Sequence, residues 1–231
     1  MSQSQQLYRV KLINRFGRWI LRPIGRLIYR LFARPTVYGL ENVPQNGPYI
    51  IAINHISIFE PPFVIPFWPS PPEPLGAAEV WREPDKALLA KFYGGIPIDR
   101  DSYDRQALEN VVTAIQGGAR VLIAPEGRLS RVPGLRRAKL GIAYLAERTN
   151  ATIVPVGISG ATQDFLKKVL KGERPPISMH IGRPFKLPPI SELMGSRKDV
   201  FQQNADRVMA RIAALLPEEY RGFYADYSAY L

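Results

Sequence analysis

Two side chains with complementary proton chemistry, His55 and Glu60, follow the apolar run 49–54. A histidine Nε2 can remove a proton from a hydroxyl when a carboxylate accepts from Nδ1–H and fixes the tautomer. One continuous helix would keep the pair apart, because residues turn by about 100° each and positions five apart diverge by about 140°. Pro61, however, suits a first helical residue, with Glu60 just outside the helix. We therefore expect residues 56–59 to form a turn that folds Glu60 back towards His55.

The residue types narrow the chemistry that is available elsewhere. The chain of 231 residues contains no cysteine and only two histidines, His55 and His180. The lack of cysteine excludes disulfides, thiolate metal sites and a cysteine nucleophile. Two histidines also argue against a multi-histidine metal site, and Ser57 lacks the motif that presents a nucleophilic serine. We therefore predict no metal.

Short apolar runs alternate with helical patterns after residue 35, which is typical of an α/β domain. We expect strands at 36–39, 49–54, 75–80, 96–100, 120–124, 152–158 and 178–181. We expect helices near 84–93, 103–116, 137–149, 162–171 and 198–216, and a kinked short helix with a stiff loop in the proline-rich stretch 61–74. The predicted fold is a single domain, 36–231, with a central mixed sheet flanked by helices and preceded by an N-terminal helical arm, 1–35.

The arm carries much of the positive charge. The formal net charge is +11, and residues 1–40 contain eight basic and no acidic side chains, which leaves +3 for the remainder. Apolar residues recur in the arm at spacings of three and four, which predicts an amphipathic helix. Pro23 lacks an N–H, so we expect two helical pieces that meet near Arg22. Arginines interrupt every apolar run, so the pattern predicts neither a transmembrane span nor a cleaved signal peptide.

A helix with a Trp/Phe/Leu face and an arginine face is typical of the membrane interface, where its cations lie near anionic headgroups. We therefore predict that the arm binds an anionic membrane surface, and that the protein is peripheral or monotopic at the cytoplasmic face. The alternative is an ordinary amphipathic helix that packs on the domain with solvated arginines. Nucleic acid is not an expected partner, because no nucleic-acid motif accompanies the basic stripe.

Three further motifs follow NHISIFE at 54–60. GGIPIDR at 94–100 ends in Arg100, PEGR at 125–128 follows a strong strand, and IVPV at 153–156 carries a valine–proline pair. Together the four resemble the glycerophospholipid acyltransferase family, typified by 1-acyl-sn-glycerol-3-phosphate acyltransferases. That family has an NHxxxxD block, a glycine-containing stretch that ends in arginine, a PEG block with a nearby arginine, and an apolar block with a V-P pair. The resemblance spans about residues 36–185.

The resemblance implies direct acyl transfer to phosphatidic acid or a related lipid. His55, oriented by Glu60, would be the general base on the free hydroxyl of a lysophospholipid such as 1-acyl-sn-glycerol-3-phosphate. That hydroxyl would attack the thioester of acyl-CoA or an acyl carrier protein, with no resident cofactor. Arginines make charge-assisted, often bidentate contacts to phosphate. The residues expected to bind substrate are Asn54, Arg100, Glu126, Gly127 and Arg128.

Three details depart from the family pattern. Glu60 stands where aspartate is usual, and the extra methylene shifts the carboxylate by more than about 1 Å unless the backbone compensates. The third motif reads EGRLS where EGTRS is commoner, and a lysine often found around residues 77–79 is missing. Two other readings stay open: an acyltransferase for another lysophospholipid or a lipid-linked alcohol, and a catalytically weak membrane-binding protein on the same fold.

Overall fold

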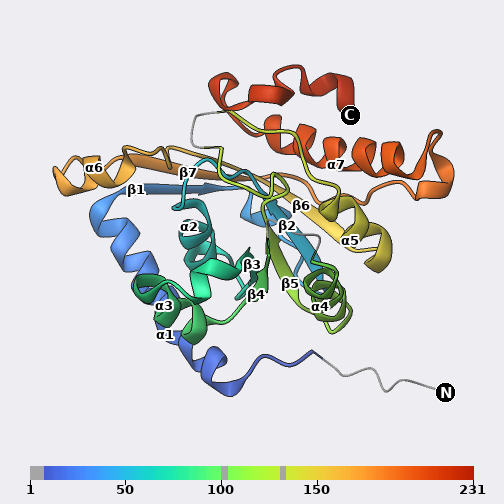
Figure 1. Ribbon diagram of the computed structural model, residues 1–231. Helices are drawn as coiled ribbons and strands as arrows, with labels where there is room; N and C mark the ends of the chain where they lie inside the picture. Colours follow the sequence, from blue (N-terminus) through green and yellow to red (C-terminus); the bar gives the residue numbers. More distant parts are fainter. Residues whose placement is uncertain (1–7, 100–103, 131–133) are drawn as a thin grey trace.

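A seven-stranded mixed sheet forms the centre of the protein (Figure 1). The computed structural model describes residues 8–99, 104–130 and 134–231. The strands are β1 (Arg34–Tyr38), β2 (Tyr49–Ile53), β3 (Glu73–Ala77), β4 (Ile96–Ile98), β5 (Arg120–Ile123), β6 (Thr152–Ser159) and β7 (Pro176–Ile181). They lie in the order β1-β7-β6-β2-β5-β3-β4, and every neighbouring pair is parallel except β6 with β7. The predicted α/β class with a mixed sheet is confirmed.

Helices cover both faces of the sheet, as Figure 1 shows. The central strand β2 is buried on both faces: Ile50 and Ala52 join one core, and Tyr49, Ile51 and Ile53 join the other. The first core is completed by α4 (Arg105–Gln116), α5 (Gly141–Thr149) and α7 (Arg197–Ala213). The second is completed by α1 (Leu12–Phe32), α2 (Glu60–Phe67) and α6 (Phe165–Leu170), while α3 (Pro84–Tyr93) packs against α1.

Two predicted elements differ from the structure in ways that have a physical cause. The strand expected at 75–80 starts earlier and ends at Ala77, because residues Ala78–Trp81 form a turn of 3-10 helix. The helix expected from residue 137 begins only at Gly141. Before that point, the Arg136 N–H donates to the Glu126 carboxylate and the Lys139 N–H donates to the Pro125 carbonyl, so this stretch is tied to the loop after β5.

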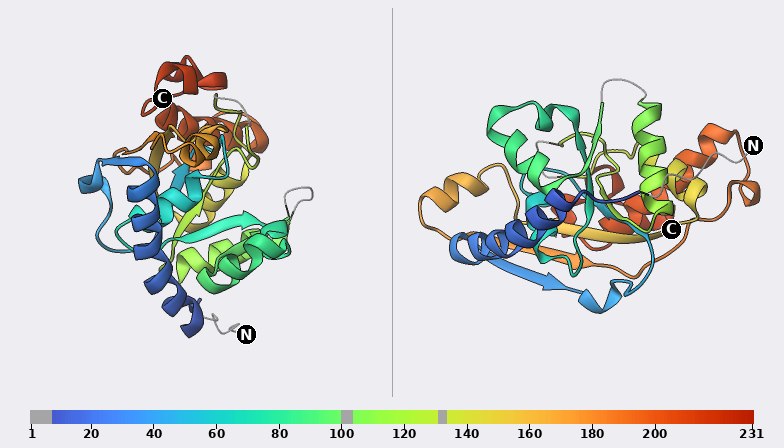
Figure 2. Two further views of the ribbon diagram at one scale, coloured as in Figure 1. Left: turned by 90° about the vertical axis from the view of Figure 1, so that its left-hand side faces the viewer. Right: turned by 90° about the horizontal axis from the view of Figure 1, so that it is seen from below.

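The arm forms one continuous helix, α1, and the predicted break near Pro23 was wrong. The helix includes Pro23 and runs to Phe32, and Figure 2 shows it as one rod along the outside of the domain. Contacts on both sides of the proline hold the helix, because Arg22 and Arg26 donate to carbonyls at the end of α2. Tertiary packing contributes most of the stability of helices in proteins, and here it overrides the local cost of proline.

The side of α1 that faces the domain is mainly polar as far as Arg26, and beyond it Tyr29 packs into the second core. Asn14 and Arg18 donate to the last carbonyls of α3, as Arg22 and Arg26 do for α2. These carbonyls lack partners within their own helices and carry the negative end of the helix dipole, so cations stabilise them. Arg18 also forms a buried 2.7 Å salt bridge with Glu73 of β3. The arginine stripe therefore docks the arm onto the ends of two helices.

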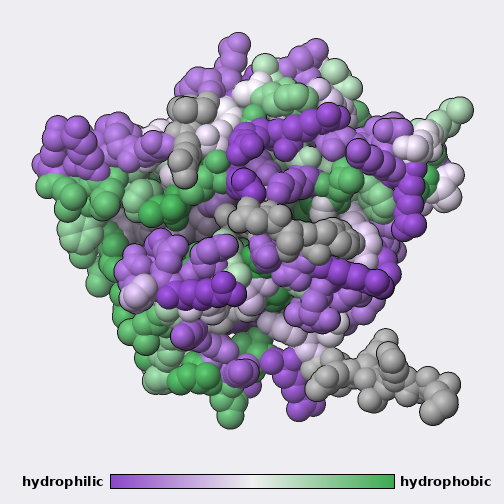
Figure 3. All heavy atoms as spheres, viewed as in Figure 1, coloured by the Kyte–Doolittle hydropathy of each residue, from purple (hydrophilic) through white to green (hydrophobic). Residues whose placement is uncertain are grey.

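The opposite side of α1 is apolar and faces solvent. Trp19 is 73% exposed, and Leu166 and Leu170 of α6 are exposed as well. Figure 3 shows apolar residues gathered along the left-hand edge of the molecule, where α1 runs below α6. The exposed apolar side chains of α1 are Leu12, Ile13, Phe16, Trp19, Ile24, Leu27, Ile28, Leu31 and Phe32. Of the alternative, the packing of the helix on the domain is confirmed, whereas Arg18, Arg22 and Arg26 bind carbonyls instead of being solvated.

Within the described parts of the chain, none of the helices combines the length and the apolar character that a membrane crossing requires. The exposed face of α1 thus belongs to a helix that lies against the domain along its length. Apolar faces of this kind on protein surfaces are typical of interaction sites for proteins, membranes or ligands.

Candidate active site

The turn after β2 brings the side chains of His55 and Glu60 together. The Nδ1 atom of His55 lies 3.2 Å from an Oε atom of Glu60. Glu60 is fully buried, and His55 is 6% exposed at the surface. The fold-back that the sequence predicts is confirmed, with α2 starting at Glu60 itself. With Nδ1–H donated to the carboxylate, Nε2 carries the lone pair that a general base needs.

Backbone and hydroxyl donors fix the Glu60 carboxylate. It accepts from the Ser57 N–H at 2.9 Å, from the Ser57 hydroxyl at 3.2 Å and from the Ile56 N–H at 3.3 Å. Burial raises the pKa of Glu60, while the hydrogen bond and charge of His55 lower it. These donors favour the ionised carboxylate against the cost of burial. The glutamate thus reaches both the histidine and the turn despite its extra methylene.

Glu126 of the PEGR motif holds the backbone of His55. One of its carboxylate oxygens accepts from the His55 N–H and the other from the Arg136 N–H, each at 2.8 Å. The Ser130 N–H donates to the carbonyl of His55 at 2.9 Å. Glu126 is buried, and burial raises its pKa to about 7. Glu126 and Ser130 therefore hold the backbone of His55 through its N–H and its carbonyl, respectively.

The side chain of Asn54, like that of Glu126, binds backbone groups. Its amide donates to the Ile158 carbonyl at 2.9 Å and accepts from the Ile158 N–H at 2.7 Å, which ties the end of β2 to β6. Asn54 is completely buried. Both Asn54 and Glu126 thus bind backbone groups that support His55, and their contact with substrate stays a prediction.

Two of the remaining predicted residues, Gly127 and Arg128, lie on the loop after β5. Gly127 has a φ of 70°, and the aliphatic part of Lys139 lies against it. The side chains of Arg128 and Lys139 are exposed, and both residues lie between β5 and α5. Arg100 lies outside the described residues.

Sequence reasoning missed Arg136 and Ser130, whose backbone N–H groups hold Glu126 and His55. Every residue except proline has such a donor, so residue type gives no signal for this role. The only available signal is that Ser130 and Arg136 follow the PEGR motif within a few residues, which would suggest a loop that folds back onto the motif.

The comparisons with known proteins place the chain in a family. The acyltransferase family model matches residues 34–159. The chain belongs to the acyltransferase family. This segment of the acyltransferase contains β1 to β6 and every residue of the His55–Glu60 and PEGR motifs. The resemblance drawn from four short motifs is confirmed.

Two individual relatives agree with this assignment. A 1-acyl-sn-glycerol-3-phosphate acyltransferase from Borreliella burgdorferi is 26% identical over 147 residues, 63% of this chain and 59% of the relative. The match thus spans little more than half of that protein. The crystal structure of the 1-acyl-sn-glycerophosphate (LPA) acyltransferase PlsC from Thermotoga maritima superposes with a TM-score of 0.64 over 88% of this chain and 81% of that one. At 18% identity, it shows the shared fold.

Proposed function

We propose that the protein transfers a fatty acyl group from an acyl thioester to the free hydroxyl of 1-acyl-sn-glycerol-3-phosphate, which gives phosphatidic acid. The observation that supports it best is the buried His55–Glu60 pair in a chain of the acyltransferase family. The relatives named for this reaction support the choice of acceptor. Acyl-CoA and acyl-loaded carrier protein are the two candidate donors.

His55 acts as the general base in the proposed reaction. Its Nε2 takes the proton of the acceptor hydroxyl as the oxygen attacks the thioester carbonyl. The C–S bond then breaks, and the leaving thiolate takes the proton back from Nε2. A simple thiol has a pKa near 8.5, so the thiolate is a good leaving group and no covalent enzyme intermediate is needed. Glu60 stabilises the imidazolium and keeps Nδ1 protonated throughout.

The phosphate of the acceptor binds on the loop side of the site. Arg128 is exposed one residue after Gly127, and Lys139 lies against the same glycine. A phosphate between these cations gains charge-assisted hydrogen bonds. We include Arg100 of the second motif in this phosphate site. Because Glu126 fixes the loop to His55, phosphate binding and proton transfer share one rigid support.

Replacing Gly127 by alanine tests this support. The backbone φ of 70° disfavours alanine by about 1–2 kcal/mol, and an added Cβ would lie 2.8 Å from Cδ of Lys139. Gly118→Ala is the matched control, because its φ is 93° and nothing lies within 4 Å of its added Cβ. We expect similar losses of stability in urea unfolding, but a fall in kcat/KM of about tenfold or more only in Gly127→Ala. Equal kcat/KM in the two variants would contradict the loop assignment.

The exposed apolar face of α1 is proposed to lie in the membrane interface, with the protein peripheral or monotopic at the cytoplasmic face. Aromatic and aliphatic side chains point outward from a helix whose polar side is docked on the domain. Arg15 and Arg30 are exposed on the same helix and can meet anionic headgroups. The face therefore supplies apolar area and charge together, as interfacial helices do.

Trp19→Ser with Leu27→Ser should weaken binding to phosphatidylglycerol vesicles by about tenfold or more, since each removes an apolar side chain from the lipid-facing side. Co-sedimentation with vesicles measures the effect. Removal of the whole arm is a poor test, because Arg18 and Tyr29 are buried in the domain. Met194→Ser is the control, since Met194 is 92% exposed and lies before α7. Vesicle binding that falls equally in the control and the α1 variant would remove the interfacial proposal.

An acceptor panel separates the proposed reaction from its nearest alternative. The panel contains lysophosphatidic acid, three lysophospholipids with larger headgroups and a lipid-linked alcohol, each with acyl-CoA and with acyl carrier protein. We expect lysophosphatidic acid to have the highest kcat/KM. A higher value for another lysophospholipid would establish the alternative acceptor, and inactivity on the whole panel would favour a weak or non-catalytic membrane-binding protein.

A further inference from the structure

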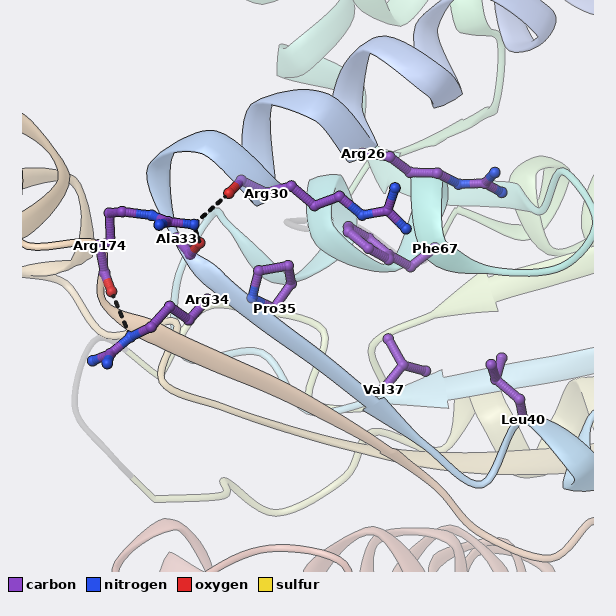
Figure 4. A pocket seen from close by; sticks show the side chains of 9 residues that line it. All are labelled: Arg26, Arg30, Ala33, Arg34, Pro35, Val37, Leu40, Phe67 and Arg174. Atoms are coloured by element: carbon purple, nitrogen blue, oxygen red, sulfur yellow. Dashed lines mark hydrogen bonds between the residues drawn. The ribbon is translucent and has the colours of Figure 1, made fainter.

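A basic cavity lies between the C-terminal end of α1, strand β1 and the end of α2. Its volume is about 480 Å³, and four of its nine lining residues are arginines: Arg26, Arg30, Arg34 and Arg174. Figure 4 shows Arg26 and Arg30 extending from α1 on the same side as Phe67, with Pro35, Val37 and Leu40 opposite them. None of the proposed catalytic or acceptor-binding residues lines this cavity.

The charge of the cavity is unbalanced. No aspartate or glutamate is among its lining residues. The side chains of Arg26 and Arg30 extend in the same direction, whereas that of Arg34 runs away from them towards the carbonyl of Arg174 (Figure 4). Like charges that share one concave site, as Arg26 and Arg30 do, repel each other. A bound anion would relieve that repulsion. Guanidinium groups in particular match the oxygen geometry of phosphate, to which they donate in pairs.

Backbone contacts hold three of the four arginines, Arg26, Arg34 and Arg174, in place. Arg174 adopts a left-handed φ of 49° and donates to the carbonyls of Arg30 and Ala33 at the end of α1. Arg34 donates through Nε to the carbonyl of Arg174, and Arg26 through Nε to α2. A guanidinium has five N–H donors, so these bonds leave donors for a ligand. These three cations are therefore positioned before any anion binds, and Arg30 extends beside Arg26 from the next turn of α1.

The size and lining of the cavity favour a lipid headgroup over inorganic phosphate. A volume of about 480 Å³ is in the range of small-molecule sites and exceeds the need of a single phosphate. Apolar side chains of Phe67, Val37 and Leu40 stand beside the cations. Leu27 and Leu31, next to Arg30 on α1, belong to the exposed apolar face. A phosphate that is joined to glycerol and acyl chains can contact all of these groups.

We propose that this cavity binds the phosphate of an anionic glycerophospholipid headgroup, at a site separate from the acceptor phosphate. That the ligand is a membrane lipid rests on the proposed docking of α1 at a membrane. The binding of the headgroup does not depend on the proposed acyl transfer. A lipid held here would fix the depth and rotation of α1 at the surface. Tyr29 on the same helix donates to the carbonyl of Phe59, directly before Glu60, so that orientation extends to the catalytic turn.

The test is calorimetric titration of the full chain with dihexanoyl-phosphatidylglycerol below its micelle concentration. A monomeric lipid has no surface potential, so only contacts within a site contribute. We expect Arg26→Gln with Arg30→Gln to weaken binding about tenfold or more, because these two guanidiniums lie on the same side of the cavity and two charge-assisted contacts are lost. The control, Arg82→Gln with Arg183→Gln, changes the net charge equally at two exposed arginines outside the cavity and should stay within about twofold of wild type. Equal weakening in both double variants would overturn the proposal.

Three further arms complete the test. Arg30→Gln alone, which removes no side-chain hydrogen bond known among the described residues, should weaken binding severalfold and serves if the double variant fails to fold. Inorganic phosphate should bind at least tenfold more weakly than the lipid, and equal affinity would overturn the headgroup assignment. Arg128→Gln should keep the cavity's affinity while it loses acceptor binding. Thus failure of the acceptor site and failure of this cavity give different results.

Discussion

His55→Ala is expected to lower kcat for acyl transfer by about 10³-fold, because a positioned general base contributes about 10²–10⁴-fold. The loss should fall on kcat more than on KM, since the phosphate contacts of the acceptor lie on the loop after β5. Folding should persist. Without the imidazole, the buried Glu60 loses one of the groups that lower its pKa, and it can bind a proton in place of the hydrogen bond from Nδ1. Steady-state rates with circular dichroism spectra measure both effects.

The second histidine of the chain provides a matched control. His180 lies on β7, and its ring packs against Tyr38 of β1 with 4.6 Å between ring centroids. His180→Ala removes the same side chain from a site without a carboxylate partner among the described residues. We expect kcat within about threefold of wild type in this variant. Similar rates in the two alanine variants would show that His55 is not the base.

Glu60→Gln is expected to lower kcat by about 10²–10³-fold. The Ser57 N–H is shared by both carboxylate oxygens, but the Ile56 N–H and the Ser57 hydroxyl donate only to Oε1. The amide of glutamine would therefore place its oxygen at the Oε1 position and its NH₂ towards His55. Nδ1 would then have to accept a hydrogen bond, which places the ring proton on Nε2 and removes the base. Steady-state kinetics with lysophosphatidic acid measure this loss directly.

Glu60→Asp should retain much more activity than Glu60→Gln, with a loss of about tenfold or less. Aspartate keeps the negative charge and the protonated Nδ1, but its shorter side chain shifts the carboxylate relative to His55 and Ser57. Comparable rates for Glu60→Gln and wild type would rule out the orienting role of this carboxylate. A larger loss in Glu60→Asp than in Glu60→Gln would mean that geometry, rather than charge, dominates.

The contact at the centre of the site could be predicted because its signal is local. Pro61 marks a helix start, and the four residues before Glu60 leave room for one turn back to His55. The functions of Asn54 and Glu126 could not be predicted in the same way. A motif shows that a polar side chain is present, but whether it faces substrate or backbone depends on the packing of β6 and of the loop 134–140.

The fold shows the same division between local and tertiary information. Apolar runs located the seven strands, because buried strands exclude polar side chains. The amphipathic pattern predicted helix in the arm but not which side packs. That choice depends on the free carbonyls at the ends of α2 and α3, which attract Arg18 and Arg22 and turn the apolar side outward. The same contacts stabilise α1 on both sides of Pro23, so the helix continues past the proline.

The central claim is tested most directly by thiol release from acyl-CoA or acyl carrier protein in the presence of lysophosphatidic acid. The chain has no cysteine, so a thiol reagent reports the leaving group without a signal from the protein itself. We expect wild-type protein to release free thiol only when acceptor is added, with one phosphatidic acid formed per thiol. Thiol release that is independent of acceptor, or none with either donor, would contradict acyl transfer by His55.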